Sequence, residues 1–423
     1  MKPTEPIEQP RHFEDFAPRD GQADILQKVA DLDDYLRHSP PDYLDGIGLH
    51  LLGPAAPVVR IRDRRQRTHE MIMLGSNSYL DLTTDPAVVA ASRQACADYG
   101  YGMGAVSLYA GTTDLHRTLE DLIARFYGAE DAILFPCGYS MNVGVISALC
   151  GAGDVVIQDA ANHASLFDGA RLSGAEIRVY LHRNMTHLEK VLKRLPASQK
   201  GRLIVTDGVF SMDGDLAPLD RIVELAERHG ARVMIDEAHA LGIVGATGRG
   251  TAERFACGGR IAITCGTLSK TPGAIGGYCA GSRALVQYLR YYARTYFFST
   301  SLPAPVVAGL IEVFHRLSAD RAGREALWHN VRYLLHGLQA LGFDTGHTES
   351  AIIPVGVGDE SKMACFHREL LQRGVFTNMV TYPAVRRKEC RLRVSVMRSL
   401  TRADMDRALA AFEEAGRKLG IIK

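Results

Sequence analysis

The chain has 423 residues, of which 46% are hydrophobic and 23% charged, an ordinary composition for a globular protein with a large core. Its formal net charge of +1 gives no electrostatic reason to expect nucleic acid as a partner. The eight cysteines form no CxxC pair, and the amino terminus lacks the apolar core of a signal peptide. We therefore expect free thiols and a cytoplasmic protein without an integral membrane segment.

The first predicted elements are small. Residues 1–22 are rich in proline and charge, which predicts a flexible arm. A helical period follows at 24–39, and the stretches VVRIRD and HEMIM are typical of short strands. We assign residues 1–75 to an N-terminal arm, a helix and small strands.

From about residue 85, helical stretches alternate with short apolar runs. The runs are AILF, DVVIQD, IRVYL, RLIVTD, ARVMID, IAITC and GYCAG. Continuous β-branched runs between helices predict an α/β domain with a mostly parallel, seven-stranded sheet. We place this large domain at 76–305. Long helical segments followed by a few strands and a last helix predict a smaller α+β domain at 306–423.

Open α/β sheets bind ligands beyond the carboxyl ends of their strands. Asp236 ends the run ARVMID, and Lys270 follows IAITC within GTLSKTPGAIGG, where no other charged residue lies between 261 and 281. A poorly solvated lysine has a lowered pKa and forms Schiff bases with carbonyl compounds, including pyridoxal 5'-phosphate (PLP). The stretch therefore predicts a nucleophilic lysine at the mouth of the sheet.

PLP also requires a carboxylate at its ring nitrogen, a flat partner for its ring and a phosphate seat. Asp236 and His163 suit the first two requirements. The phosphate seat would comprise Gly138, Tyr139, Thr267 and Ser269. There are two alternatives for this stretch. DEAH at 236–239 could be a helicase-type motif of a nucleotide-driven motor, but the sequence lacks the G-x-x-x-x-G-K-[ST] phosphate loop that such a motor requires. Asp236 alone could instead cap the next helix. We expect no metal site.

Motifs from about residue 45 to the end resemble the α-oxoamine synthases, a branch of the fold type I PLP enzymes. The matching stretches are LGSNSYLDL, GTTDLHRTLE, FPCGYSMNVGVI, NHASLFDG, DGVFSMDGDLAPL, IDEAHALGIVGATGRG, GTLSKTPGAIGGY, YFFSTSLP and CRLRVSV. The resemblance implies the fold type I transferase architecture. It also implies that Lys270 bonds covalently to the cofactor, that Asp236 pairs with the ring nitrogen and that His163 stacks on the ring.

Further roles follow from the same resemblance. His239 and Ser211 would lie at the phenolic oxygen of the cofactor. The residues implied to reach the phosphate of the other subunit, in a homodimer with shared active sites, are Ser299 and Thr300. The implied substrate-binding residues are Asn77 and Arg393, whereas Arg391 is expected to be a structural neighbour.

The resemblance implies decarboxylative condensation of a small L-amino acid with an acyl thioester of CoA or a carrier protein, giving an α-amino ketone. ARTYFFSTS and TESAIIPV favour bacterial serine palmitoyltransferases and hence serine, ahead of alanine or glycine. YGMGAVSLYAGT and YPAV favour the 2-amino-3-ketobutyrate CoA ligase type. The alternatives are that activity, 8-amino-7-oxononanoate synthase activity, a PLP aminotransferase, and a non-enzymatic protein that keeps the fold. Asp81, Ser107 and Thr381 depart from the family pattern on the substrate side.

Overall fold

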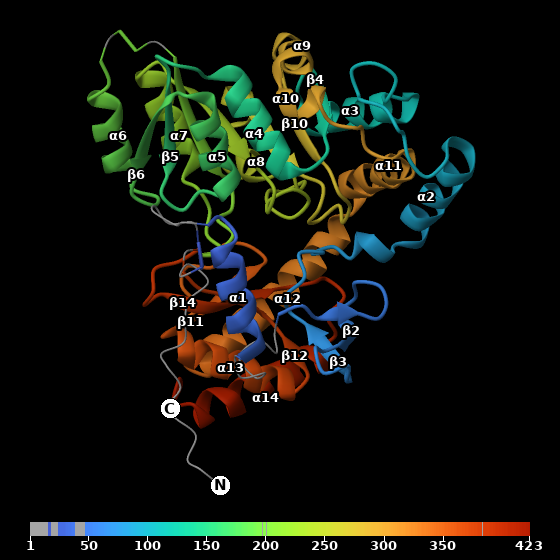
Figure 1. The fold of residues 1–423 in the computed structure, drawn as a ribbon, viewed down its shortest axis with the longest axis vertical. Coiled ribbons are helices and arrows are strands. Elements are labelled where there is room, and N and C mark those ends of the chain that lie inside the picture. The colour runs from blue at the N-terminus through green and yellow to red at the C-terminus, as the bar shows by residue number, and fades with distance from the viewer. Residues whose placement is uncertain (1–15, 18–23, 39–46, 197, 200, 383) are drawn as a thin grey trace.

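The computed structural model describes residues 16–17, 24–38, 47–196, 198–199, 201–382 and 384–423 (Figure 1). The predicted arm at 1–22 lies outside the described residues except for Phe16 and Ala17. Figure 1 shows one layer built around the largest sheet and a second layer that contains both the amino-terminal strands and the carboxyl-terminal elements.

The largest sheet has seven strands in the order β4-β10-β9-β8-β7-β5-β6. Strand β10 is antiparallel to both of its neighbours, and the other neighbouring pairs are parallel. The mostly parallel seven-stranded sheet is therefore confirmed. Its strands are β4 (Asp131–Phe135), β5 (Val155–Asp159), β6 (Glu176–Tyr180), β7 (Arg202–Asp207), β8 (Arg232–Asp236), β9 (Ile263–Thr267) and β10 (Gly277–Gly281).

Helices cover both faces of this sheet because successive strand residues point to opposite sides. Val156 and Met234 pack in a core with α4 and α5, whereas Ile157 and Ile235 pack with α6 and α7. The helices of this layer are α2 (Pro86–Tyr99), α3 (Asp114–Tyr127), α4 (Gly138–Leu149), α5 (Ala164–Ser173), α6 (Met185–Lys193), α7 (Leu219–Arg228), α8 (Thr251–Arg254), α9 (Arg283–Tyr292) and α10 (Arg294–Phe297).

The second layer contains two small sheets. One, in the order β11-β14-β13, comprises β11 (Ile352–Gly358), β13 (Asn378–Val380) and β14 (Cys390–Ser395). The other has the order β1-β2-β3-β12, with β1 (His50–Leu51), β2 (Val58–Arg62), β3 (Thr68–Met73) and β12 (Val375–Phe376). Because β12 is parallel to β3, amino- and carboxyl-terminal segments share a sheet. The boundaries after residues 75 and 305 remain predictions.

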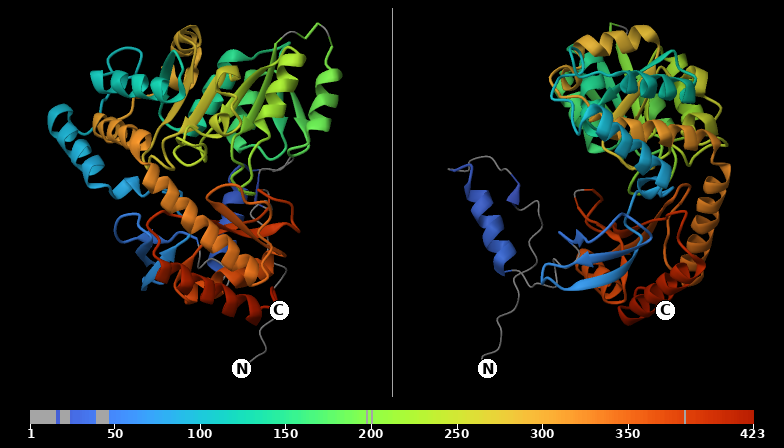
Figure 2. Two further views of the ribbon diagram at one scale, coloured as in Figure 1. Left: turned by 180° about the vertical axis from the view of Figure 1, so that it is seen from behind. Right: turned by 90° about the vertical axis from the view of Figure 1, so that its right-hand side faces the viewer.

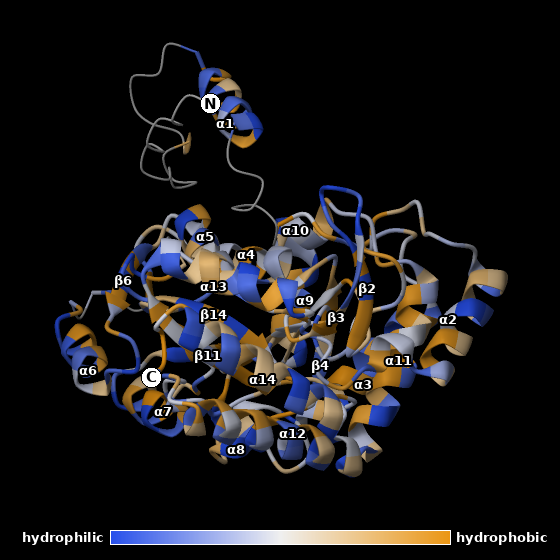
Figure 3. Ribbon diagram, turned by 90° about the horizontal axis from the view of Figure 1, so that it is seen from below, coloured by the Kyte–Doolittle hydropathy of each residue, from blue (hydrophilic) through white to orange (hydrophobic). Residues whose placement is uncertain are grey.

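Long helices join and cover these sheets: α11 (Ala304–Ala319), α12 (Arg321–Ala340), α13 (Glu360–Gln372) and α14 (Arg402–Lys418). Seen from below, they show hydrophilic and hydrophobic stretches in alternation (Figure 3), as expected of helices that bury one face. Helix α1 (Gln27–His38) has no buried residue and stands apart from the body (Figure 2). Among the described residues, no helix is long and apolar enough to cross a bilayer.

Candidate active site

A cavity of about 280 Å³ opens where β7, β8 and β9 end, the edge at which the sequence places its site. The carboxyl ends of adjacent parallel strands lie side by side, so strand-end residues far apart in the sequence meet there. The predicted residues that line this cavity are Gly138, Tyr139, His163, Ser211, Asp236, His239, Thr267, Ser269 and Lys270.

Asp236 is a buried carboxylate with both oxygens engaged. Its Oδ1 accepts a hydrogen bond from the backbone N–H of Ala238 at 2.9 Å, and its Oδ2 accepts one from Asn142 Nδ2 at 2.6 Å. Asn142 Nδ2 also donates to Ser165 Oγ at 2.9 Å. A carboxylate fixed in this way can receive a hydrogen bond from a protonated ring nitrogen in the cavity.

Lys270 is half-buried and lines the same cavity. Desolvation lowers the pKa of its amine below the ordinary value, and the charges of Asp236 and Asp207 oppose part of that shift. Within the described part of the chain, the Lys270 amine has no hydrogen-bond or ion-pair partner. A lysine with a lowered pKa and an unengaged amine is suited to nucleophilic chemistry.

His163 lies on the cavity wall at the start of α5. Its Nδ1 is 2.8 Å from Ser165 Oγ, and its backbone N–H donates to Asp207 Oδ2 at 2.8 Å. Its ring meets the ring of Tyr139 edge to face, with centroids 6.3 Å apart. Desolvation lowers the pKa of His163, which favours the neutral imidazole that can stack on a flat ring.

The first turn of α4 and the end of β9 form a cradle suited to phosphate. The backbone N–H groups of Gly138 and Tyr139 lie in the first helical turn, where no helix carbonyl can accept from them. A Cβ at Gly138 would stand 2.7 Å from the Cβ of Thr267, so only glycine fits. Thr267 Oγ1 is 2.8 Å from Ser269 Oγ, which places two hydroxyls beside those N–H groups.

A chain of hydrogen bonds links the cavity to the second layer. His239 Nδ1 lies 2.7 Å from the hydroxyl of Tyr79, which donates to Asn77 Oδ1 at 3.3 Å. Arg393 Nη2 donates to the same Asn77 oxygen at 2.8 Å, and its Nη1 donates to the carbonyl of Ser211 at 3.4 Å. Burial and nearby cations hold the pKa of His239 well below its ordinary value, so this ring is neutral.

Other predicted residues lie outside this cavity. Ser299 and Thr300 do not line it; they follow α10, and Thr300 bridges to Val106. Arg391 pairs with Asp213 at 2.5 Å, so the two arginines of CRLRVS have different surroundings. Asp81 has a left-handed backbone with φ 52°, a conformation that favours glycine, and its Oδ2 accepts from the N–H and hydroxyl of Ser399.

Sequence reasoning missed four residues of this site: Asn142, Ser165, Asp207 and Tyr79. Asp207 ends β7, so the strand-end rule that selected Asp236 could have found it. Asn142 lies inside α4, where a single polar residue carries no local signal. Tyr79 reaches His239 across 160 residues of sequence, a contact that spacing cannot reveal.

These surroundings fit pyridoxal phosphate: an unengaged amine, a fixed carboxylate and a glycine-containing turn with backbone N–H groups and hydroxyls for a phosphate share one cavity. The fold and the site thus define a PLP-dependent enzyme of fold type I. Residues 69–412 match the model of the class I and II aminotransferase family, and the chain belongs to that family.

Similarity to individual relatives indicates which branch of the family the chain belongs to. The chain is 46% identical over 353 residues to 8-amino-7-oxononanoate synthase of Symbiobacterium thermophilum, covering 84% of this chain and 90% of that one. It is 38% identical over 416 residues to the 4-hydroxy-2,2'-bipyrrole-5-methanol synthase of a Serratia strain, covering 98% of this chain but 63% of that one.

Among solved structures, serine palmitoyltransferase of S. paucimobilis with a bound PLP–myriocin aldimine has a TM-score of 0.88 and 35% identity, covering 94% of this chain and 100% of that one. Together these similarities confirm the predicted α-oxoamine synthase family, the fold type I architecture and PLP as the cofactor. The protein is a PLP-dependent acyltransferase of this branch.

Proposed function

We propose that the protein condenses L-serine, or alanine or glycine in second place, with an acyl thioester and expels carbon dioxide. The new carbon–carbon bond joins the amino-acid α-carbon to the acyl carbonyl carbon. The thiol leaves with a proton, the carboxylate leaves as carbon dioxide, and a proton returns to the α-carbon. The product is an α-amino ketone, which agrees with the 8-amino-7-oxo product in the names of several relatives.

Arg393 carries this proposal. Its guanidinium is buried, Asn77 and the Ser211 carbonyl engage its two terminal nitrogens, and its Nε–H has no partner among the described residues. An unsatisfied buried donor is costly, so an acceptor such as a substrate carboxylate would relieve it. A carboxylate held at this edge would fix which bond at the α-carbon can break.

When bound, PLP supplies an electron-withdrawing ring that stabilises negative charge on the substrate α-carbon. Lys270 would hold this cofactor, and its neutral amine would then remove the α-proton of the amino acid. Asp236, fixed by Asn142, would keep the ring nitrogen protonated. His239 would hydrogen-bond the phenolic oxygen, and Tyr79 orients its ring.

We also propose a homodimer in which Ser299 and Thr300 reach the phosphate of the other subunit. Both lie outside the cavity of their own chain. Large aromatic side chains nearby in the sequence are exposed, including Phe298 at 67% and Tyr291 at 61%, which suits burial against a second copy. Mixing Lys270→Ala chains with Thr300→Trp chains tests whether the two subunits share their active sites. We expect each mixed dimer to regain one active site, in which the intact Lys270 of one chain meets the intact Thr300 of the other. A mixture without restored activity would contradict the shared sites.

The reaction itself is tested with a panel of L-serine, L-alanine and glycine against acyl thioesters, following free thiol and the mass of the amino ketone. Arg393→Gln should raise the KM for the amino acid about tenfold or more, because one charge-assisted hydrogen bond contributes about 1.5–3 kcal/mol. Arg391→Gln is the matched control and should change that KM little. Keto-acid-dependent amino transfer without thiol release would overturn the proposal in favour of an aminotransferase.

A further inference from the structure

The hydrogen bonds of the Asp236 carboxylate continue through two helices and end at the ring of His163. Asn142 Nδ2 on α4 donates to Asp236 Oδ2 at 2.6 Å and to Ser165 Oγ on α5 at 2.9 Å. Ser165 Oγ lies 2.8 Å from His163 Nδ1. Asn142 is 1% exposed and Ser165 is 0% exposed, so solvent does not compete for these bonds. We call these four side chains the Asp236–His163 network.

The direction of each hydrogen bond in this network follows from the carboxylate. An ionised carboxylate only accepts, so Asn142 must turn its NH2 group toward Asp236 rather than its carbonyl oxygen. Both amide hydrogens are then engaged, one by Asp236 and the other by Ser165 Oγ. The Ser165 hydroxyl has one hydrogen of its own to donate, and His163 Nδ1 is its one remaining partner among the described residues. His163 Nδ1 is therefore an acceptor.

A backbone contact leads to the same assignment. The backbone N–H of Ser165 points at His163 Nδ1 across 3.3 Å, and a backbone N–H can only donate. Because Nδ1 accepts, the one proton of the neutral imidazole is on Nε2. Nε2 has no partner in the part of the chain that the structure describes, and the ring lines the active-site cavity. This N–H is thus available to a molecule bound in the cavity.

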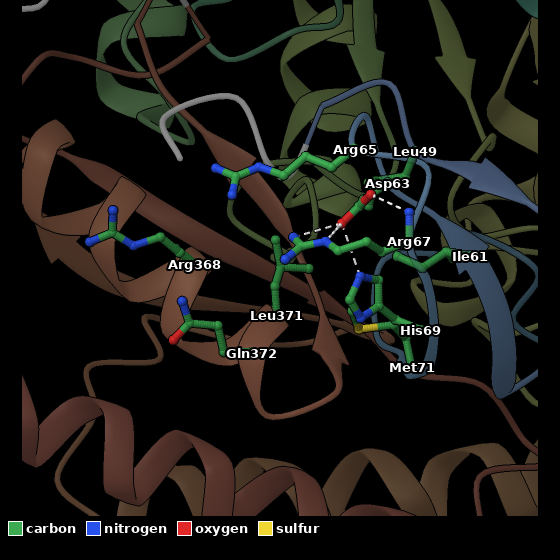
Figure 4. Close-up of a pocket in the computed structure, with 10 residues that line it drawn as sticks. All are labelled: Leu49, Ile61, Asp63, Arg65, Arg67, His69, Met71, Arg368, Leu371 and Gln372. Atoms are coloured by element: carbon green, nitrogen blue, oxygen red, sulfur yellow. Dashed lines mark hydrogen bonds and ion pairs between the residues drawn. The ribbon is translucent and has the colours of Figure 1, made fainter. Parts of the chain in front are cut away.

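Two other histidines contact carboxylates directly and show what the intervening side chains change. His69 Nε2 lies 2.9 Å from Asp63 Oδ2 in a cavity between the β2–β3 turn and α13 (Figure 4). Desolvation lowers the pKa of His182, but hydrogen bonds to two carboxylates raise it overall to about 10. At His163 a neutral amide and a hydroxyl separate the imidazole from Asp236, and desolvation lowers the pKa of the ring.

We propose that Ser165, oriented by Asn142, fixes His163 in the tautomer that carries its proton on Nε2, so that a neutral ring stacks on the cofactor and donates from Nε2 to the bound substrate. The inference rests on the proposed function for the substrate that receives this hydrogen bond, whereas the tautomer does not depend on the reaction. Ser165 and Asn142 are positioning residues, because they act through His163.

The test measures the protonation of His163 in the holoenzyme with and without the Ser165 hydroxyl. The test variant is Ser165→Ala. The matched control is Ser173→Ala, which removes a hydroxyl that donates to the Ala170 carbonyl at the other end of α5. Nitrogen-15 NMR of labelled histidine reports which ring nitrogen carries the proton, and His163→Gln identifies the signal. Hydrogen exchange at the ring C2, followed by mass analysis of the peptide that contains His163, reports the pKa.

The titratable groups around the imidazole stay in place in both variants. They are Asp207 on β7, Asp236 on β8, Lys270 after β9, Tyr139 on α4 and Asp168 on α5. Ser165→Ala should raise the pKa of His163, because the neutral ring loses a donor to Nδ1 that the charged ring cannot use. It should also lower kcat about 2- to 10-fold, the effect of one hydrogen bond, whereas Ser173→Ala should leave the pKa and kcat unchanged.

In the wild type we expect a bare Nδ1 and a protonated Nε2. A proton on Nδ1 in the wild type, or the same His163 pKa in Ser165→Ala and the wild type, would overturn the proposal. Equal shifts in the two alanine variants would overturn it as well, because they would reflect a general change in α5. If Ser165→Ala does not fold, Ser165→Cys replaces it with a weaker donor of similar size, and its His163 pKa should again exceed that of the wild type.

Failure of this proposal and failure of the proposed function are distinguishable. The tautomer and the pKa are measured without substrate, so they decide the role of Ser165 even if no amino acid and thioester react. Conversely, a wild type that forms the amino ketone while His163 carries its proton on Nδ1 overturns the role of Ser165 and leaves the proposed function intact.

Discussion

Replacing Asp207 with alanine should impair the active site, although every residue that the sequence assigns to the cofactor is unchanged. Asp207 is 6% exposed and accepts the backbone N–H of His163 at 2.8 Å. Its removal leaves that N–H in the cavity wall without its acceptor, which costs about 1–3 kcal/mol. If this cost destabilises the enzyme with its cofactor and substrate bound, the combined decrease in the fraction of PLP retained and in kcat should be about 5- to 150-fold.

Asp207→Asn is the matched variant. Burial and the charge of Asp236 raise the pKa of Asp207 well above its ordinary value, and asparagine keeps the size of the native side chain. The asparagine oxygen can still accept from His163, and we expect a loss of about threefold or less. The assays are PLP retained after dialysis and kcat at saturating amino acid. An alanine variant with native retention and kcat, or an asparagine variant as damaged as the alanine one, would refute the reasoning.

Three further changes test other parts of the structure. Glu120→Ala should lower the free energy of unfolding by about 3–5 kcal/mol, because it removes the hydrogen-bonded carboxylate of the buried Arg290 guanidinium and leaves only the Asp131 carboxylate, 3.9 Å away; a loss below about 1 kcal/mol in urea unfolding would contradict this. Desolvation opposes protonation of His182, but hydrogen bonds to two carboxylates raise the pKa of His182 to about 10. Its stabilising contribution is therefore complete below about pH 6.5 and lost as the pH rises through about 10, so the Tm advantage of the wild type over His182→Gln should vanish there. Tyr79→Phe removes the hydrogen bond to His239 and should lower kcat about 5- to 150-fold in a stopped-flow assay with native PLP retention; unchanged kcat would exclude an orienting role.

The sequence was most informative for features that follow from a local pattern of residues, namely the strands and the residues at their ends. The seven apolar runs are the seven strands of the main sheet, because β-branched runs between helices suit a sheet covered on both faces. Lys270 and Asp236 could be selected because parallel strands end at one edge, so residues that follow them must meet. Asp207 obeys the same rule and could have been predicted.

Contacts between distant segments could not be predicted. Arg393 and Asn77 are 316 positions apart, and no periodicity in either segment indicates that β14 lies beside the residues after β3. Strand β12 has two residues and is held by parallel pairing with β3 rather than by its own sequence. The departure at Asp81 is accommodated in part, since Ser399 donates to Oδ2 of the carboxylate, whereas Oδ1 is buried without a hydrogen-bond partner among the described residues.

The central claim is that Lys270 and Asp236 serve one PLP molecule in the cavity at the end of the main sheet. Reduction of the holoenzyme with borohydride, followed by mass analysis of its peptides, tests this most directly. We expect the phosphopyridoxyl group on the peptide that contains Lys270, and its loss in Lys270→Ala. A label on another lysine, or retention of the label by the alanine variant, would contradict the account.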